Sequence, residues 1–270
     1  MRHPVSLALA VVALVACTTP TQKRVGAHTT AAPVSAQPPP IPWSKKSTAA
    51  HLTIVHFSDS EAGLLPDDAS ADGGGIARAQ ALISALKDRA GKDSVVLAAG
   101  DMFIPAPELD LEIDGKSAIL QSDNMLLVQA SGLGNHELDR GEQFLADAIA
   151  QMQWPYLTAT LSVMDGPLKK LYVDGAGPTQ WTSDIAGKLA PRAKICVGDR
   201  SGDACSGFVV GLVGATTEQL RLISKGASAD LAVPNDLNGV RAAVQAQVDA
   251  LRGEGIKIVI LLSHLQGAAR

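Results

Sequence analysis

The sequence lacks an excess of positive charge. It carries 23 Lys and Arg against 27 Asp and Glu, which gives a formal net charge of −4, and the basic residues form no dense cluster. Proteins that bind nucleic acids present a basic patch or stripe on one face. We therefore expect no dedicated nucleic-acid surface on this protein.

An apolar stretch long enough to span a membrane is also missing. The uncharged run 5–16 is short, follows Arg2 and His3, and ends in Leu-Val-Ala before Cys17. A spanning helix needs about 20 apolar residues, whereas a short run behind a positive front is typical of a signal peptide. We predict a signal peptide with a lipobox over 1–17 and a lipid on Cys17. The alternative is an ordinary secretory signal with an incidental cysteine. Both predict export, and the first predicts a lipoprotein anchored to a membrane of the cell envelope, at its periplasmic or outer face.

Large apolar residues are scarce in the segment that follows. Residues 18–50 are rich in Thr, Ala, Ser and Pro, with prolines at 38, 39, 40 and 42. Such a composition cannot bury enough apolar surface to fold, and clustered prolines extend the chain. We predict a disordered tether over 18–50 and a folded domain over 51–270.

Cysteine is rare, with three residues in the whole chain. If Cys17 carries a lipid, Cys196 and Cys205 remain, at the two ends of a polar, glycine-containing loop. In an oxidising compartment this arrangement favours a disulfide bond. A zinc site is the other interpretation, but two cysteines without a nearby histidine disfavour it.

The segment 51–270 alternates apolar runs with helical stripes. Apolar residues recur every three to four positions over 76–90, 144–152 and 237–251, and 119–128 also has a helical pattern. Continuous apolar runs that predict buried strands occupy 52–57, 95–99, 130–133, 155–161, 170–173, 207–213 and 256–262. This pattern predicts a layered α/β fold with strands buried on both sides, and it shows no internal repeat.

Four of these strands end in side chains that can bind a metal ion. Asp59, Asp101, Asn135 and His264 each follow an apolar run, and glycine precedes Asp101 and Asn135. Carboxylates, amides and imidazoles are common ligands of divalent cations. The ends of buried strands commonly carry binding sites, so we expect these side chains to converge.

These blocks resemble the calcineurin-like metallophosphoesterases, and specifically their 5′-nucleotidase branch. That family has Asp-x-His, then Gly-Asp, then Gly-Asn-His-Glu, then a lone His, then Gly-His-x-His. Here Asp59 begins the first block, 100–101 matches the second, 134–137 the third, and His264 the fourth. The resemblance covers about residues 51–270 and implies a layered αββα sandwich.

The resemblance also implies a role for each residue. Two divalent metal ions, of which Zn, Mn or Co suit neutral Asn and His ligands, would be held with Asp101 as the bridge. Asp59 would bind the first ion, and Asn135 and His264 the second. His136 would donate a proton or hydrogen bond to the phosphoryl group or leaving oxygen, and Asp139 would orient its imidazole.

The sequence departs from the family pattern in two places. Glu61 stands where the first block has its histidine, and it is either a metal ligand or a solvated loop residue. The sequence ends at Arg270, beyond His264, without the final Gly-His-x-His block, so we expect a domain that is incomplete at the C-terminus.

The function implied is hydrolysis of a small phosphate ester by an exported, metal-dependent phosphoesterase. Phosphomonoesters, and nucleotides among them, are the expected substrates. The alternative is a chain that keeps the fold without catalysis, either as a pseudoenzyme or as a binding lipoprotein.

Overall fold

The structure, a computed structural model, describes residues 8–15, 51–65 and 74–266. The expected lipidation site, Cys17, and the expected tether, 18–50, lie outside the described residues. Within the described ranges, no helix combines the length and the apolar character that crossing a membrane would require.

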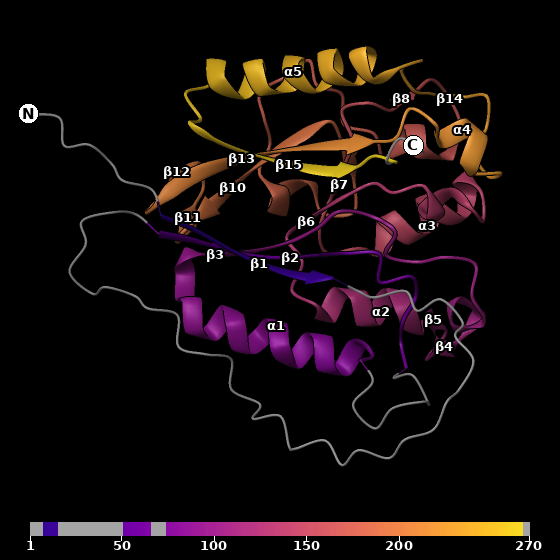
Figure 1. The fold of residues 1–270 in the computed structure, drawn as a ribbon, viewed down its shortest axis with the longest axis horizontal. Coiled ribbons are helices and arrows are strands. Elements are labelled where there is room, and N and C mark those ends of the chain that lie inside the picture. Colours follow the sequence, from indigo (N-terminus) through magenta and orange to yellow (C-terminus); the bar gives the residue numbers. More distant parts are fainter. Residues whose placement is uncertain (1–7, 16–50, 66–73, 267–270) are drawn as a thin grey trace, which may run out of the picture.

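Two sheets form the centre of the molecule (Figure 1). The first has the order β1-β2-β3-β6-β7-β9 and is parallel throughout. Its strands are β1 (Ala8–Val15), β2 (His51–Ser58), β3 (Ser94–Ala98), β6 (Ala130–Gly132), β7 (Tyr156–Leu157) and β9 (Leu189–Ala190). The second has the order β10-β13-β15, with β10 antiparallel and β15 parallel to β13. Its strands are β10 (Arg192–Val197), β13 (Phe208–Thr216) and β15 (Ile258–His264).

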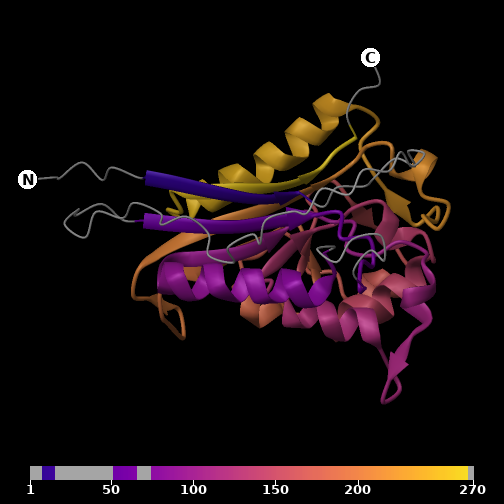
Figure 2. The ribbon, with the colours of Figure 1, turned by 60° about the horizontal axis from the view of Figure 1, so that its bottom comes forward.

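Helices cover the two outer faces of this pair of sheets. The helices are α1 (Ile76–Ala90), α2 (Ala118–Met125), α3 (Glu142–Gln151), the short α4 (Leu220–Ile223) and α5 (Leu237–Gly253). Figure 2 shows α1 and α5 on opposite sides of the strands. Helices α1 to α3 cover the first sheet and α5 covers the second, so the layers run αββα as expected.

The alternation of residues along β2 and β3 explains these layers. Val55 on β2 and Val96 on β3 pack with the helices, whereas their neighbours Ile54 and Val95 face the second sheet. Successive side chains of a strand point to opposite faces, so a continuous apolar run is required when both faces are buried.

Three two-stranded ribbons lie outside these two sheets. They are β4 (Glu112–Ile113) with β5 (Lys116–Ser117), β8 (Ser162–Val163) with β14 (Leu231–Ala232), and β11 (Arg200–Ser201) with β12 (Ala204–Cys205). At the third ribbon, Cys196 and Cys205 are joined in a disulfide bond that closes the loop between β10 and β13.

The part of the predicted signal-peptide core that the structure describes, β1, lies at the edge of the first sheet. Backbone pairing aligns Ala8 with His51 and Val15 with Ser58. An open strand edge offers unpaired N–H and C=O groups that an apolar extended segment can satisfy. Such pairing does not bear on whether the segment is removed after export, and the signal peptide stays a prediction.

Two expected strands differ from the structure. The strand expected over 170–173 is wrong, because Pro167–Lys170 forms a 3-10 turn and only Tyr172 makes an isolated bridge, to Leu189. Proline favours the first turn of a helix, which explains the turn. The strand expected over 155–161 ends at Leu157, because Ala159 then donates its N–H to Gly214 of the second sheet.

Candidate metal centre

The turns after β2 and β3 lie against each other and present two aspartates. The N–H of Asp59 donates to the carbonyl of Gly100 at 3.1 Å, and the N–H of Glu61 donates to that of Asp101 at 3.0 Å. Asp59 and Asp101 have φ angles of 54° and 51°. Left-handed backbone is uncommon outside glycine, and it is found at functional sites where surrounding contacts hold it in place.

Glycine is required where this pair of turns meets the turn after β6. A Cβ atom on Gly100 would lie 2.4 Å from the nitrogen of Gly134, and a Cβ on Gly134 would lie 2.1 Å from Oδ1 of Asp101. Neither position has room for a side chain. The two glycines therefore bring the ligand-bearing turns to backbone contact.

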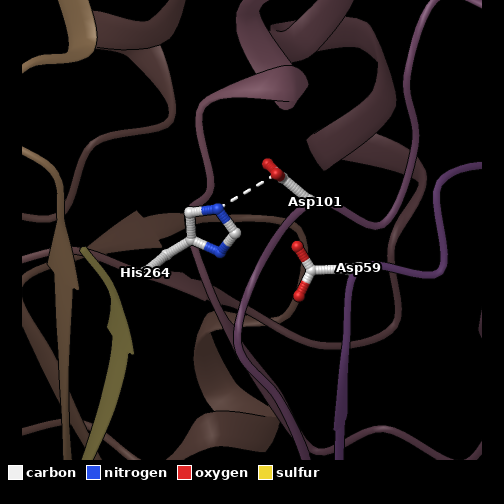
Figure 3. A group of neighbouring side chains, drawn as sticks. All are labelled: Asp59, Asp101 and His264. Carbon is white, nitrogen blue, oxygen red and sulfur yellow. Dashed lines mark ion pairs between the residues drawn. The ribbon is translucent and has the colours of Figure 1, made fainter. Parts of the chain in front are cut away.

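Asp59, Asp101 and His264 form a cluster whose candidate ligand atoms all lie within 4.8 Å of one another (Figure 3). They come from the ends of β2, β3 and β15, so both sheets contribute. Nε2 of His264 lies 3.0 Å from Oδ2 of Asp101. Among the described residues, this is the one group of three or more His, Cys, Asp and Glu side chains that could hold a metal ion.

The orientation of His264 fits a metal ligand. Its Nδ1 lies 2.8 Å from the carbonyl oxygen of Ala99. A carbonyl oxygen only accepts, so Nδ1 carries the hydrogen and Nε2 faces the carboxylates. Histidine ligands characteristically donate their second N–H in this way, which fixes the tautomer and the ring. Two carboxylates and one such imidazole are a suitable donor set for a divalent transition-metal ion.

The charges in the cluster support each other. Burial alone would lower the pKa of His264, but the hydrogen bond and charge of Asp101 raise it to about 9. Burial would raise the pKa of Asp101, but His264 and His136 lower it below its ordinary value. The cluster therefore favours an ionised carboxylate, which is the form that binds a cation.

His136 and Asp139 form a pair beside this cluster. Nδ1 of the His136 ring lies 2.5 Å from Oδ2 of Asp139. The backbone N–H of His136 donates to Oδ1 of Asp101 at 2.9 Å. Burial would lower the pKa of His136, but Asp139, Asp101 and Glu61 together raise it. Asp139 therefore holds the imidazole through Nδ1, and the nearby carboxylates favour its protonated form.

Glu137, a residue without a role in the expected ligand set, lies at the centre of the turns. It is fully buried, Oε2 accepts from the N–H groups of Gly134 (2.9 Å) and Asp101 (3.1 Å), and Oε1 accepts from Met102 (2.7 Å). Burial and the charge of Asp101 raise its pKa to about 7. Its place in the Gly-Asn-His-Glu block was the signal for it.

The other two expected ligands are Glu61 and Asn135. Glu61 follows Asp59 on the same turn with a φ of 49°, but its carboxylate does not join the group. The side chain of Asn135 is buried, and its Oδ1 accepts a hydrogen bond from Nε2 of Gln266 at 2.8 Å. Both assignments stay predictions, and a metal on Asn135 would replace the bond to Gln266.

An αββα sandwich with candidate metal ligands clustered at its strand ends is the arrangement that the resemblance to the calcineurin-like metallophosphoesterases, a metal-dependent family, predicts. No protein-family model matches the chain. The described fold nevertheless matches a calcineurin-like phosphoesterase of Bacillus subtilis, with a TM-score of 0.55 at 21% identity, over 79% of this chain and 61% of that one.

Within that class, the sequence similarity is to 5′-nucleotidases. A 5′-nucleotidase of Bos taurus is 27% identical over 222 residues, which are 79% of this chain and 33% of that protein. The 5′-nucleotidase precursor of Thermus thermophilus is 28% identical with a TM-score of 0.61, over 79% of this chain and 37% of that one. The chain is thus similar to 5′-nucleotidases and to calcineurin-like phosphoesterases, and it spans about a third of the length of the 5′-nucleotidases.

Proposed function

We propose that this protein hydrolyses phosphomonoesters, nucleotides foremost, with the help of two divalent metal ions such as Zn, Mn or Co. The observation that carries the proposal is the cluster of Asp59, Asp101 and His264 with the His136–Asp139 pair bonded to it. The similarity to 5′-nucleotidases supports the substrate class.

Asp101 is the residue suited to bridge two ions. Its two carboxylate oxygens face different partners. Oδ2 lies beside Nε2 of His264, and Oδ1 accepts from the backbone N–H of His136. Asp59 and Glu61 would complete one side, and Asn135 and His264 the other. When bound, the ions supply positive charge that stabilises the phosphoryl oxygens.

His136 is suited to act as the proton or hydrogen-bond donor. Asp139 occupies Nδ1, which leaves Nε2 as the atom that can meet a substrate. The raised pKa keeps the ring protonated over a wider pH range, as a general acid requires. The phosphoryl group or the leaving oxygen would accept from it.

The proposal includes export and a lipid anchor on Cys17. It is supported by the apolar run 5–16 behind a positive front and by the Leu-Val-Ala-Cys ending. In this arrangement the tether 18–50 would separate the membrane from the folded domain.

Metal analysis and phosphatase assays on the purified chain test the chemistry. We expect hydrolysis of AMP and of an aryl phosphate by a version of the protein that also carries the Gly-His-x-His block of the family. Asp101→Asn should lose both metal and activity, whereas His136→Ala should keep the metal and lose roughly 10²–10⁴-fold in rate. Asp199→Asn is the control, because its carboxylate pairs with Lys92 before the start of β3, away from the ligand-bearing ends.

Two outcomes would oppose the proposal. Near-parent metal content and activity in Asp101→Asn would refute the two-metal assignment. Bound metal without turnover of any phosphate ester would favour the alternative, a lipoprotein that keeps the fold for binding and has lost catalysis.

A further inference from the structure

Ser224 contacts the His136–Asp139 pair from behind, although it lies 85 residues further along the chain. Its hydroxyl donates to Oδ1 of Asp139 at 3.3 Å, while Oδ2 of the same carboxylate meets Nδ1 of His136. Ser224 is 2% exposed, so water does not compete freely for its hydroxyl. The Asp139 carboxylate thus lies between two partners, with Ser224 at Oδ1 and His136 at Oδ2.

The backbone around Ser224 holds it in this place. Its N–H donates to the carbonyl of Leu220 at 2.8 Å, which closes the end of α4. Two residues on, a Cβ atom on Gly226 would lie 1.7 Å from the carbonyl oxygen of Leu138 and 2.7 Å from the nitrogen of Gly141. The segment 224–226 therefore runs in backbone contact with the turn that carries His136 and Asp139.

We propose that Ser224 is a positioning residue for the His136–Asp139 pair. Its hydroxyl fixes the rotation of the Asp139 carboxylate, so that Oδ2 stays aimed at Nδ1 of His136. The imidazole then keeps one orientation, with Nε2 free for the substrate. The effect on turnover rests on the proposed function, but the effect on the histidine hydrogen bond does not.

The kinetic test compares Ser224→Ala with Ser224→Thr, which keeps a hydroxyl. Loss of such an outer partner typically costs about 10-fold or more in activity. We expect Ser224→Ala to lower kcat about 10-fold on an aryl phosphate at unchanged KM and metal content, and Ser224→Thr to retain most of kcat. In an Asp139→Ala background, Ser224→Ala should have no further effect. An equal loss in both backgrounds, or no loss in either, would overturn the proposal.

A proton NMR measurement decides the matter even if the protein hydrolyses no phosphate ester. The hydrogen bond between Nδ1 of His136 and Asp139 should give a downfield imidazole N–H resonance, assigned by its absence in His136→Gln. We expect Ser224→Ala to shift or broaden it and Ser224→Thr to restore it. Ser94→Ala is the matched control, because Ser94 is also a buried serine, and its hydroxyl bonds to Gly91 before β3. An unchanged resonance in Ser224→Ala would refute the positioning role.

Discussion

Replacement of Glu137 by glutamine tests what holds the metal-ligand turns together. The carboxylate accepts three buried N–H groups, from Gly134, Asp101 and Met102. Glutamine keeps the shape but replaces one acceptor oxygen with an NH2 donor. If the nitrogen takes the Oε1 position, Met102 loses its acceptor. If it takes the Oε2 position, both Gly134 and Asp101 do.

At least one buried N–H is therefore left facing another donor. A buried donor without a partner costs about 1–3 kcal/mol. We expect Glu137→Gln to lower the free energy of unfolding at pH 8 by less than this cost, because the variant also removes a buried charge, and burial raises the pKa of Glu137 to about 7. Because the displaced turn carries Asp101, the affinity for Mn or Zn should fall as well.

Glu142→Gln is the matched control. Glu142 is buried too, but neither of its carboxylate oxygens has a hydrogen-bond partner among the described residues. Glutamine there removes no accepted bond, so stability and metal affinity should not fall. Urea unfolding and calorimetric metal titration measure the two quantities. Equal values for both variants would refute the reasoning that Glu137 clamps the turns.

Three further predictions concern other parts of the chain. Cys17→Ser should release the protein from membranes or block its maturation, and unchanged fractionation would contradict lipidation. Cys196 and Cys205 should resist alkylation without reductant in intact-mass analysis, and ready labelling of both would exclude the disulfide. Burial raises the pKa of Asp123 well above its ordinary value, so the folded state keeps a proton that the unfolded state loses above about pH 4. This proton should make stability fall with rising pH by up to about 1.4 kcal/mol per unit. Melts from pH 4 to 8 should show a smaller fall in Asp123→Asn than in the parent, and an unchanged fall in exposed Asp88→Asn. Equal slopes in parent and Asp123→Asn would oppose the prediction.

The layers and the clustered ligands could be predicted because their signals are local. Both β2 and β3 are apolar on two faces, and each ends directly before an aspartate-bearing turn. Parallel strands place such ends at the same edge of a sheet. His264 also lies at the end of a strand, β15, but its meeting with Asp59 and Asp101 depends on how the second sheet packs on the first.

The strand expected over 170–173 failed for a different physical reason. The segment has apolar residues at Leu171 and Val173, but Pro167 begins a 3-10 turn that runs to Lys170. The N–H of Leu171 then donates back to Leu168, within the same turn. Local turn chemistry thus decided the structure over a pattern too short to specify a strand.

The contacts that support the ligands depend on distant parts of the chain. Ser224 reaches Asp139 only because Gly226 allows the segment after α4 to touch the turn before α3. Glu137 is adjacent to the ligands in sequence, yet the N–H groups that it accepts include those of Asp101 and Met102 from another strand end. Sequence pattern can therefore indicate which side chains are candidate metal ligands, whereas the orientation of each one is set by non-local packing that only the folded chain defines.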